Sequence, residues 1–363
     1  MRIAFLVPYL FRFQRGIESS ACRLASTLAG LGHDVTILTW AQRRPTAEPV
    51  FSPEVRVRSV PYFRYYRAKL AVPFYIRFLK QDRFDLVNIY FADCGESPAI
   101  RRTRRSRQFR VQFIAGYPPE LVPHRYDAFD RLGLTPLVDR VVAKSPAMVP
   151  GIRRRLNRPT VMIPNGVDAD FFSPEQFPRS RCRADLGLDS SGKVVVSVAA
   201  LEERKGIQHV IQSLPLLVKR EPGICYLIAG EGPFRPNLES QVSALGLESN
   251  VRFMGSLDDV RPLLGAADAM ALLSHGEGFP NVLLEAWAMD RPVLVSNHPP
   301  YPDVVFDHLG KRVDETNPGE VADGLEQLLA SNSGDRDGRH RQHAIQHYSW
   351  AEVASRIIAD QSE

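Results

Sequence analysis

The chain of 363 residues, 44% of them hydrophobic, is long enough to form two domains that each bury a core. No run reaches the roughly 18 apolar residues of a membrane-spanning helix. The four cysteines show no Cys-x-x-Cys spacing, which argues against a zinc site and a disulfide framework and suits a reducing cytosol. The apolar start from Met1 to Val7 is followed by Arg12 and Arg15 and by no small-residue cleavage site, so a buried first strand is expected rather than a signal peptide.

The charge is divided unevenly along the chain. Up to Asn165 there are 28 Lys and Arg against 12 Asp and Glu, a net of +16, and the remainder has 18 against 29, a net of −11. This asymmetry indicates an anionic partner for the N-terminal half, either a phospholipid surface or a lipid-phosphate acceptor. Nucleic acid is the weaker alternative, because no helix-turn-helix, zinc-finger or RNP signature is present.

The chain opens with a strand, helix and strand. They are expected at Ile3 to Val7, from about Glu18 to Leu31, and at Asp34 to Trp40, with a loop to Gly16 between the first two. The G-x-G-x-x-G fingerprint is absent from this βαβ unit. A dinucleotide-binding oxidoreductase is therefore disfavoured.

Three basic stretches follow in the same half. Tyr62 to Lys69 interleaves aromatic rings with Arg and Lys, and further arginines cluster within Arg101 to Arg110 and at Arg153 to Arg155. Each stretch alone is compatible with a solvated face. Together they favour a peripheral membrane surface or an anionic acceptor. A core helix from Phe74 to Gln81 and a strand from Phe84 to Tyr90 are expected beside the first stretch.

A domain boundary is expected at the segment Ile163 to Asp168, where Asn165-Gly166 suits a tight turn with positive φ. The first domain therefore comprises residues 1–164, and the second 165–345. The pair Asp168 and Asp170 forms a D-x-D pattern, but a linker role is favoured over a metal site. Residues 176–192 are expected to form a surface helix and loop.

The second domain begins with an apolar strand, Lys193 to Ala199, followed by a loop with Arg204, Lys205 and Gly206 and by a helix to about Lys219. The strand Cys225 to Ala229 then ends in a glycine-rich turn, and another strand is expected around Phe253.

The most informative stretch runs from Asp268 to Ala286. An apolar run typical of a strand buried on both faces is followed by a turn with Glu277, and then by a helix that carries Glu285 about one turn in. Pro280 suits the first helical position. Free N–H groups at a helix start bind phosphate, and carboxylates accept hydrogen bonds from hydroxyl groups. A nucleotide sugar offers both, a diphosphate and hydroxyl-rich rings, so the stretch suits such a ligand.

These two glutamates resemble the Glu-x7-Glu motif of retaining glycosyltransferases with the GT-B fold, of the family 4 type. The resemblance extends over nearly the whole chain, from the Asn-Gly-Val-Asp linker to the segment from Tyr348 to Ala354, which is similar to the family's closing helix. It implies two Rossmann-like α/β domains facing across a cleft, the first completed by residues from about 346 to 363. The implied donor is a UDP-, GDP- or other nucleotide-diphosphate sugar, without any cofactor or metal ion.

The resemblance also assigns roles. Lys205, with neighbouring Arg204, would neutralise the diphosphate, Glu277 would contact sugar hydroxyls, and Glu285 would hold the ribose. Gly16 would lie near the donor phosphates, and Phe253 belongs to the segment that reads the base. The remaining donor-binding positions are backbone groups of the turn: Gly278, Phe279, Pro280, Asn281 and Val282.

Some positions depart from the family pattern. Ala200 stands where an arginine is usual, no histidine follows the strand Phe109 to Ile114, and Pro299-Pro300 replace two glycines. Tyr117 or Glu120 could occupy the histidine's place.

The main interpretation is a metal-independent retaining glycosyltransferase that acts in glycan, glycolipid or polysaccharide biosynthesis. It would be cytoplasmic or peripheral at the inner face of the membrane, with a glycan, lipid-linked or small-molecule hydroxyl acceptor. A non-catalytic protein that binds nucleotide sugar or membrane, or a GT-B epimerase, are the alternatives.

Overall fold

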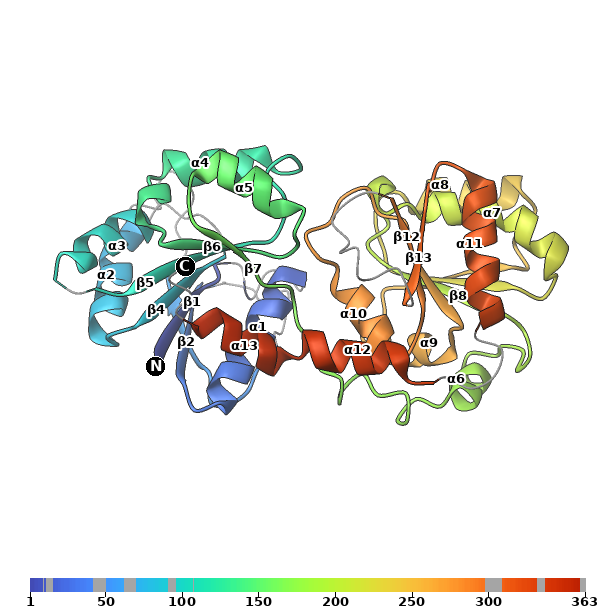
Figure 1. Ribbon diagram of the computed structural model, residues 1–363, viewed down its shortest axis with the longest axis horizontal. Helices are drawn as coiled ribbons and strands as arrows, with labels where there is room; N and C mark the ends of the chain where they lie inside the picture. The colour runs from blue at the N-terminus through green and yellow to red at the C-terminus, as the bar shows by residue number, and fades with distance from the viewer. Residues whose placement is uncertain are drawn as a thin grey trace. The chain divides into compact units, whose positions relative to one another are not determined.

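The computed structural model describes residues 1–8, 10, 16–41, 50–61, 70–90, 96–106, 108–297, 309–331 and 337–359. The chain forms two compact units (Figure 1). The N-terminal unit comprises Met1–Gly166 with Trp350–Glu363, and the C-terminal unit comprises Val167–Ser349. The segment Tyr62 to Lys69 and Pro299-Pro300 lie outside the described residues.

The N-terminal unit is built on a seven-stranded parallel sheet of order β3-β2-β1-β4-β5-β6-β7. Its strands are β1 (Arg2–Leu6), β2 (Asp34–Trp40), β3 (Arg56–Val60), β4 (Leu86–Ile89), β5 (Arg110–Ala115), β6 (Arg140–Ala143) and β7 (Thr160–Met162). Its helices are α1 (Gly16–Gly30), α2 (Val72–Gln81), α3 (Glu96–Arg104), α4 (Pro123–Arg131), α5 (Met148–Leu156) and α13 (Trp350–Ile358), with a 3-10 turn, η2 (Thr135–Leu137). Strand β1 is apolar from Ile3 to Leu6 because this part is covered on both faces: Ala4 packs towards α2–α5 and Phe5 towards α1 and α13.

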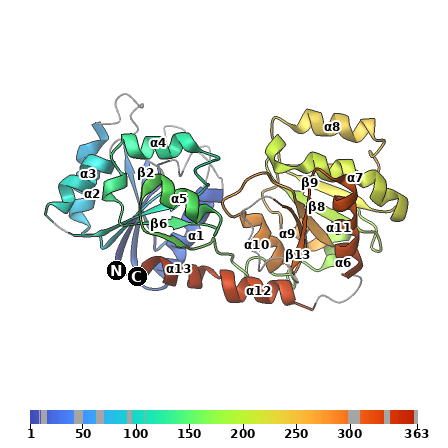
Figure 2. The same cartoon turned by 45° about the horizontal axis from the view of Figure 1, so that its top comes forward.

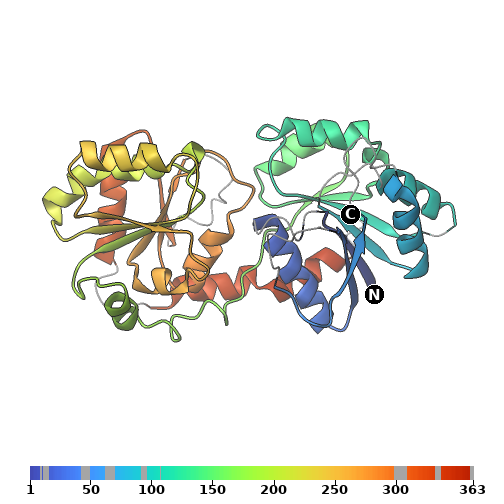
Figure 3. The ribbon, with the colours of Figure 1, turned by 180° about the vertical axis from the view of Figure 1, so that it is seen from behind.

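Helix α13 lies beside α1 on this sheet, as the red and blue helices of Figure 3 show from behind. Side chains from two strands hold its last turn. Arg140 Nη2 donates to the carbonyl of Ile357 at 2.7 Å, Arg110 Nη2 to that of Ile358 at 3.0 Å, and Gln112 Nε2 to that of Ile357 at 3.0 Å. Cations near free carbonyls stabilise the negative end of a helix, so these residues fix the C-terminal helix on the N-terminal unit.

The C-terminal unit has a six-stranded parallel sheet of order β10-β9-β8-β11-β12-β13. Its strands are β8 (Val194–Val198), β9 (Cys225–Ala229), β10 (Val251–Gly255), β11 (Ala269–Leu272), β12 (Val293–Ser296) and β13 (Gly310–Val313). Its helices are α6 (Arg179–Asp185), α7 (Ile207–Arg220), α8 (Arg235–Ala244), α9 (Arg261–Ala266), α10 (Asn281–Ala288), α11 (Pro318–Ser331) and α12 (Arg339–Tyr348), with a 3-10 turn, η3 (Glu203–Lys205). One core joins α9, α10 and α12 to the sheet, and another joins α7, α8 and α11 to its other face (Figure 2). Two Rossmann-like domains with parallel sheets are thus confirmed.

Three local predictions were wrong. Helix α10 begins at Asn281, and Pro280 precedes it as an extended cap residue (ψ 124°) instead of being its first helical residue. The segment expected to close the chain with one helix is broken at Ser349, where ψ is 144°, so α12 and α13 are separate helices. Asn165 and Gly166 do not adopt the expected positive φ. Residues 176–192 form the expected surface helix and loop, but within them Arg183 of α6 is 1% exposed.

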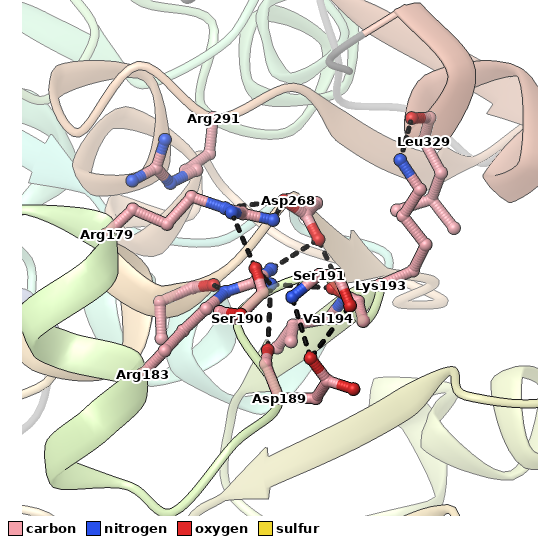
Figure 4. Close-up of polar contacts among 12 residues, drawn as sticks. Arg179, Arg183, Asp189, Ser190, Ser191, Lys193, Val194, Asp268, Arg291 and Leu329 are labelled. Carbon is pink, nitrogen blue, oxygen red and sulfur yellow. Dashed lines mark hydrogen bonds and ion pairs between the residues drawn. The ribbon is translucent and has the colours of Figure 1, made fainter. Parts of the chain in front are cut away.

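Arg183 belongs to a buried ion pair at the amino ends of β8 and β11 (Figure 4). Its Nη2 donates to Asp268 Oδ2 at 2.6 Å, and its remaining nitrogens donate to the carbonyls of residues 189, 190, 192 and 266. Arg179 and the Val194 N–H also donate to the Asp268 carboxylate. An arginine can be buried this completely because its fixed fork of donors is satisfied by nearby acceptors.

Candidate functional site

Two loops of the C-terminal unit meet at the carboxyl ends of the neighbouring strands β8 and β11. The His275 N–H donates to the Arg204 carbonyl at 2.8 Å, which joins the loop after β11 to η3 after β8. Gly206 lies between η3 and α7 with φ +71°, and a Cβ there would fall 2.0 Å from the Leu273 carbonyl oxygen. The close approach of the two loops therefore requires glycine at this position.

Three of the predicted residues come together where these loops touch. Lys205 Nζ forms an ion pair with Glu277 Oε1, and Arg204 Nη1 lies 4.0 Å from the same oxygen. The Arg204 Nε donates to Glu202 at 2.8 Å. The Glu277 side chain is only 8% exposed and that of Lys205 14%, whereas Arg204 is 42% exposed. The cluster thus offers cations at its surface above a buried carboxylate.

The sequence did not indicate two serines that support this cluster. Ser274 Oγ donates to Glu277 Oε1 at 3.0 Å, and Ser296 Oγ, at the end of β12, donates to the Ser274 carbonyl at 2.7 Å. Both serines are at most 1% exposed. Ser274 directly precedes the predicted turn, but only strand order brings it and Ser296 together.

The loop then enters α10, which carries the other predicted donor-binding positions. Phe279 is buried in the core and stacks on Tyr348 with ring centroids 5.5 Å apart, so only its backbone can serve a ligand. Gly278 and Pro280 are buried as well, while Asn281, Val282 and Glu285 are half-buried on the first turns of the helix. The partial positive charge of this helix start lies at Asn281, four residues after Glu277.

A second glycine turn follows β9. Gly230 has φ +137°, and a Cβ on it would lie 1.9 Å from the Ala199 carbonyl oxygen; one on Gly232 would lie 2.4 Å from the Leu201 oxygen. This turn therefore packs directly on the backbone between β8 and η3. Phe253 lies on the edge strand β10, half-buried, with the Arg235 guanidinium 5.5 Å from its ring centroid. It is not in the Lys205 cluster.

A histidine pair, also missed from the sequence, lies beside the cluster. His209 Nε2 on α7 and His275 Nε2 are 3.4 Å apart, and Glu315 Oε1 is 3.5 Å from His275 Nε2. Burial lowers the pKa of His209, and His275 lowers it further, against the opposing effect of Glu315 and Asp314. A state in which both rings carry a positive charge is therefore disfavoured.

The N-terminal unit carries Gly16 at the start of α1, where Ser20 Oγ donates to the Gly16 carbonyl at 2.6 Å. Glu120, considered as a substitute for the missing histidine, is exposed, with Arg154 4.0 Å away. The Tyr117 carbonyl accepts a bond from Tyr126 Oη at 2.8 Å. These contacts suit ordinary loop structure at both positions.

Part of the basic charge has internal partners, which the sequence reading did not anticipate. Besides Arg110, Arg104 donates to the carbonyls of residues 109 and 137 and pairs with Asp139. Arg155 pairs with Asp127 and Asp130, and Arg153 donates to the Thr160 carbonyl at 3.1 Å. Arg101, Arg102 and Arg105 remain exposed on and just after α3.

Within the described ranges, no group of three or more His, Cys, Asp or Glu side chains is placed to hold a metal ion. The D-x-D pattern serves a turn, because Asp168 Oδ1 accepts the Phe171 N–H at 3.0 Å. No helix of the described residues is long and apolar enough to cross a membrane.

Two family models match consecutive parts of the chain. Residues 14–171 match the model described as Glycosyltransferase Family 4, and residues 178–347 match that of Glycosyl transferases group 1. Together they span both units. The chain belongs to the family 4 glycosyltransferases of the GT-B fold.

Known proteins resemble this glycosyltransferase over its whole length. The phosphatidyl-myo-inositol mannosyltransferase of Mycobacterium tuberculosis (strain H37Rv) is 27% identical over 381 residues, covering 99% of this chain and 96% of the relative. Two solved structures share the fold with TM-scores of 0.78 and 19% identity. They are sucrose-phosphate synthase of Thermosynechococcus elongatus, covering 98% of this chain and 97% of its own, and Anabaena HepE in complex with UDP, covering 98% of each.

Proposed function

We propose that the enzyme transfers a sugar from a nucleotide-diphosphate sugar, bound by the C-terminal unit, to a hydroxyl acceptor with retention of configuration. The observation that carries the proposal is the cluster of Lys205, Arg204 and Glu277 beside the start of α10. Two cations and a helix N-terminus suit a diphosphate, while a carboxylate suits sugar hydroxyls. HepE, which shares the fold, holds UDP in its solved structure.

The reaction breaks the bond between the anomeric carbon and the diphosphate oxygen and forms one to the acceptor oxygen. Negative charge grows on the departing diphosphate, so Lys205, Arg204 and the α10 N–H groups would stabilise the transition state more than the bound donor. Attack on the face that the diphosphate leaves gives retention, and the acceptor proton passes to a diphosphate oxygen. These fixed positive charges provide the stabilisation, so the proposed scheme requires no metal ion.

Glu285 would accept the ribose hydroxyls from its place on α10, and the backbone from Gly278 to Val282 would face the diphosphate. Phe253 would lie near the base, and Gly16 near the phosphates. The turn at Gly230 and Gly232, which allows close packing on the β8 loop, would shape the same region. These assignments are tested together by donor binding.

The acceptor is proposed to be a glycolipid, a lipid-linked glycan or a polysaccharide. A relative of matching length is named for phosphatidyl-myo-inositol, and a relative from Rhizobium meliloti, 36% identical over 152 residues, is named for lipopolysaccharide core biosynthesis. The net charge of +16 up to residue 165 suits an anionic acceptor.

An anionic membrane surface is the proposed place of action, at the cytoplasmic face. Helices α2 and α3 lie side by side. Leu70 and Phe74 are 54% and 43% exposed, and Arg101, Arg102 and Arg105 are exposed on the neighbouring segment. Exposed apolar and basic side chains on neighbouring segments suit an anionic interface. Sedimentation with vesicles should require anionic lipid and weaken in Arg101→Gln/Arg102→Gln; binding that ignores lipid charge would remove this part of the proposal.

The decisive experiment is saturation-transfer NMR with a panel of UDP-, GDP-, ADP- and dTDP-sugars. We expect one donor to bind selectively and to be hydrolysed slowly, and Glu285→Ala to abolish that binding. Glu326→Ala on α11 is the matched control, because Glu326 is a half-buried helical glutamate paired with Arg220. Binding without any turnover would support a non-catalytic protein instead. The anomeric coupling of the released or transferred sugar decides between retention and inversion.

A further inference from the structure

The two carboxylate oxygens of Glu277 have different surroundings. Oε1 accepts from both Lys205 Nζ and Ser274 Oγ, and Arg204 Nη1 lies 4.0 Å from it. A carboxylate oxygen has about two lone-pair directions, so these two donors fill Oε1. Among the residues that the structure describes, no donor is bonded to Oε2. The acceptor capacity that Glu277 retains therefore lies on Oε2.

The donor that fixes this arrangement is Ser274. Ser274 is 1% exposed, its hydroxyl donates to the carboxylate three residues later, and its carbonyl accepts a hydrogen bond from Ser296. The carboxylate is therefore tied to the end of β12 as well as to Lys205. Without the Ser274 hydroxyl, Glu277 could rotate about its side-chain torsions and present either oxygen to Lys205.

We propose that Ser274 is a positioning residue that keeps Glu277 Oε1 on Lys205, and thereby presents Oε2 to one hydroxyl group of the donor sugar. The inference rests on the proposed function and deepens it. Glu277 reads the sugar with one oxygen and orients Lys205 with the other. Lys205 has three N–H donors, and within the described part of the chain it gives one to Glu277 and none to another acceptor, so the others are available to the diphosphate.

This arrangement has a consequence for the choice of donor. Oε2 of an ionised carboxylate can only accept, so it recognises a hydroxyl on the sugar and not a carbonyl or a carboxylate. A donor that lacks this hydroxyl leaves Oε2 without a partner when water is displaced, which is costly. Discrimination against one monodeoxy sugar should therefore depend on Ser274.

The test compares Ser274→Ala with wild type on the donor identified by the binding panel and on its monodeoxy analogues. We expect Ser274→Ala to lower kcat/KM for the full donor by about 10-fold or more. Affinity for the free nucleoside diphosphate should stay within twofold. For one monodeoxy donor the two enzymes should differ by less than threefold, because the hydroxyl that Oε2 would accept is missing. Ser274→Thr, which keeps a hydroxyl, should recover most of the loss.

The matched control is Ser213→Ala. Ser213 is also fully buried in the C-terminal unit, and its Oγ donates to the Val210 carbonyl at 2.8 Å on α7. Ser213→Ala should leave kcat/KM for each donor and the affinity for the nucleoside diphosphate unchanged.

A merely structural role of Ser274 would lower activity with every donor equally and would overturn the inference, as would full activity of Ser274→Ala. If Ser274→Ala does not fold, Ser274→Cys with the deoxy donors decides, because a thiol is similar in size but a weak donor. Altered discrimination in Ser274→Cys supports the inference, and unaltered discrimination refutes it. Absence of donor binding by wild type would instead refute the proposed function.

Discussion

The two ends of the C-terminal sheet each hold a buried carboxylate paired with cations, and the two pairs are built differently. At the amino ends, Asp268 and Arg183 are both at most 5% exposed, and the guanidinium donors are taken up by Asp268 and backbone carbonyls. At the carboxyl ends, Glu277 is equally buried, but Lys205 bonds to it through one of its three donors and Arg204 is 42% exposed. A pair whose donors are used internally can only hold the fold, whereas a pair with spare donors can bind a ligand.

The largest effect on stability is expected at the amino end. Asp268→Ala leaves the buried Arg183 charge without its partner and should lower the free energy of unfolding by about 3–5 kcal/mol, measured by urea denaturation. Arg181→Ala on the same helix is the control, because Arg181 is 76% exposed and should change stability by less than about 0.5 kcal/mol. A loss below 1 kcal/mol at Asp268 would contradict the structural role.

The carboxyl end should behave in the opposite way. Lys205→Ala removes the cation proposed to stabilise the departing diphosphate, and kcat/KM should fall at least 100-fold. The unfolding free energy should fall by less than in Asp268→Ala, because Ser274 still donates to Glu277 and Arg204 lies 4.0 Å from it. Lys219→Ala, at the exposed end of α7, should leave kcat/KM unchanged. Turnover of Lys205→Ala within threefold of wild type would contradict the proposed role of Lys205 in the reaction.

A third experiment extends the comparison to a cation without a carboxylate. Lys144 follows β6 and is 5% exposed, and no bonding partner for its Nζ lies in the described part of the chain. Burial lowers the pKa of Lys144 to about 7. Between pH 7 and about 10.4 the unfolded chain binds a proton that the folded chain does not. The destabilisation that results from burying Lys144 is therefore largest below pH 7 and decreases as the pH rises towards 10.4.

Lys144→Met should therefore raise the unfolding free energy by about 2 kcal/mol at pH 6.5 and by progressively less towards pH 10. Chemical denaturation over that pH range measures the trend. The exposed Lys219→Met should show no such trend. A stability loss in Lys144→Met at pH 6.5 would mean that the lysine has an acceptor in the folded protein.

The smallest effect is expected from the histidine pair beside the cluster. Because the pKa of His209 is lowered, below about pH 6.5 the unfolded chain binds a proton at this residue more readily than the folded chain does. The free energy of unfolding therefore decreases as the pH is lowered through this range. His209→Gln removes this term, so Tm should fall less between pH 7.5 and 5.5, by on the order of 2 °C at most. The exposed His124→Gln supplies the baseline, and an unchanged pH slope in His209→Gln would contradict the lowered pKa.

The fold could be predicted from sequence because its strands are buried on both faces and read as short apolar runs, as β8 and β11 do. The candidate site could be predicted only in part. Lys205 and Glu277 were both predicted as site residues. Their direct pairing depends on β8 lying next to β11, and the sequences of the two loops do not determine the order of the strands. The burial of Arg183 was not predicted, because arginines on a short helix normally face solvent. The bond between Ser296 and Ser274 could not be predicted for the same reason as the pairing, because it depends on β12 lying next to β11.

The attachment of α13 to the N-terminal unit sets an order for synthesis on the ribosome. Arg110 and Arg140 are made early, but the carbonyls they bind belong to residues 356 to 359. The whole C-terminal unit is translated in between, and domains generally fold as units while they emerge. The unit begun first is therefore finished last. Until α13 arrives, the apolar surface around Phe5 and Leu24 lacks part of its cover, so the nascent N-terminal unit exposes apolar side chains that can aggregate.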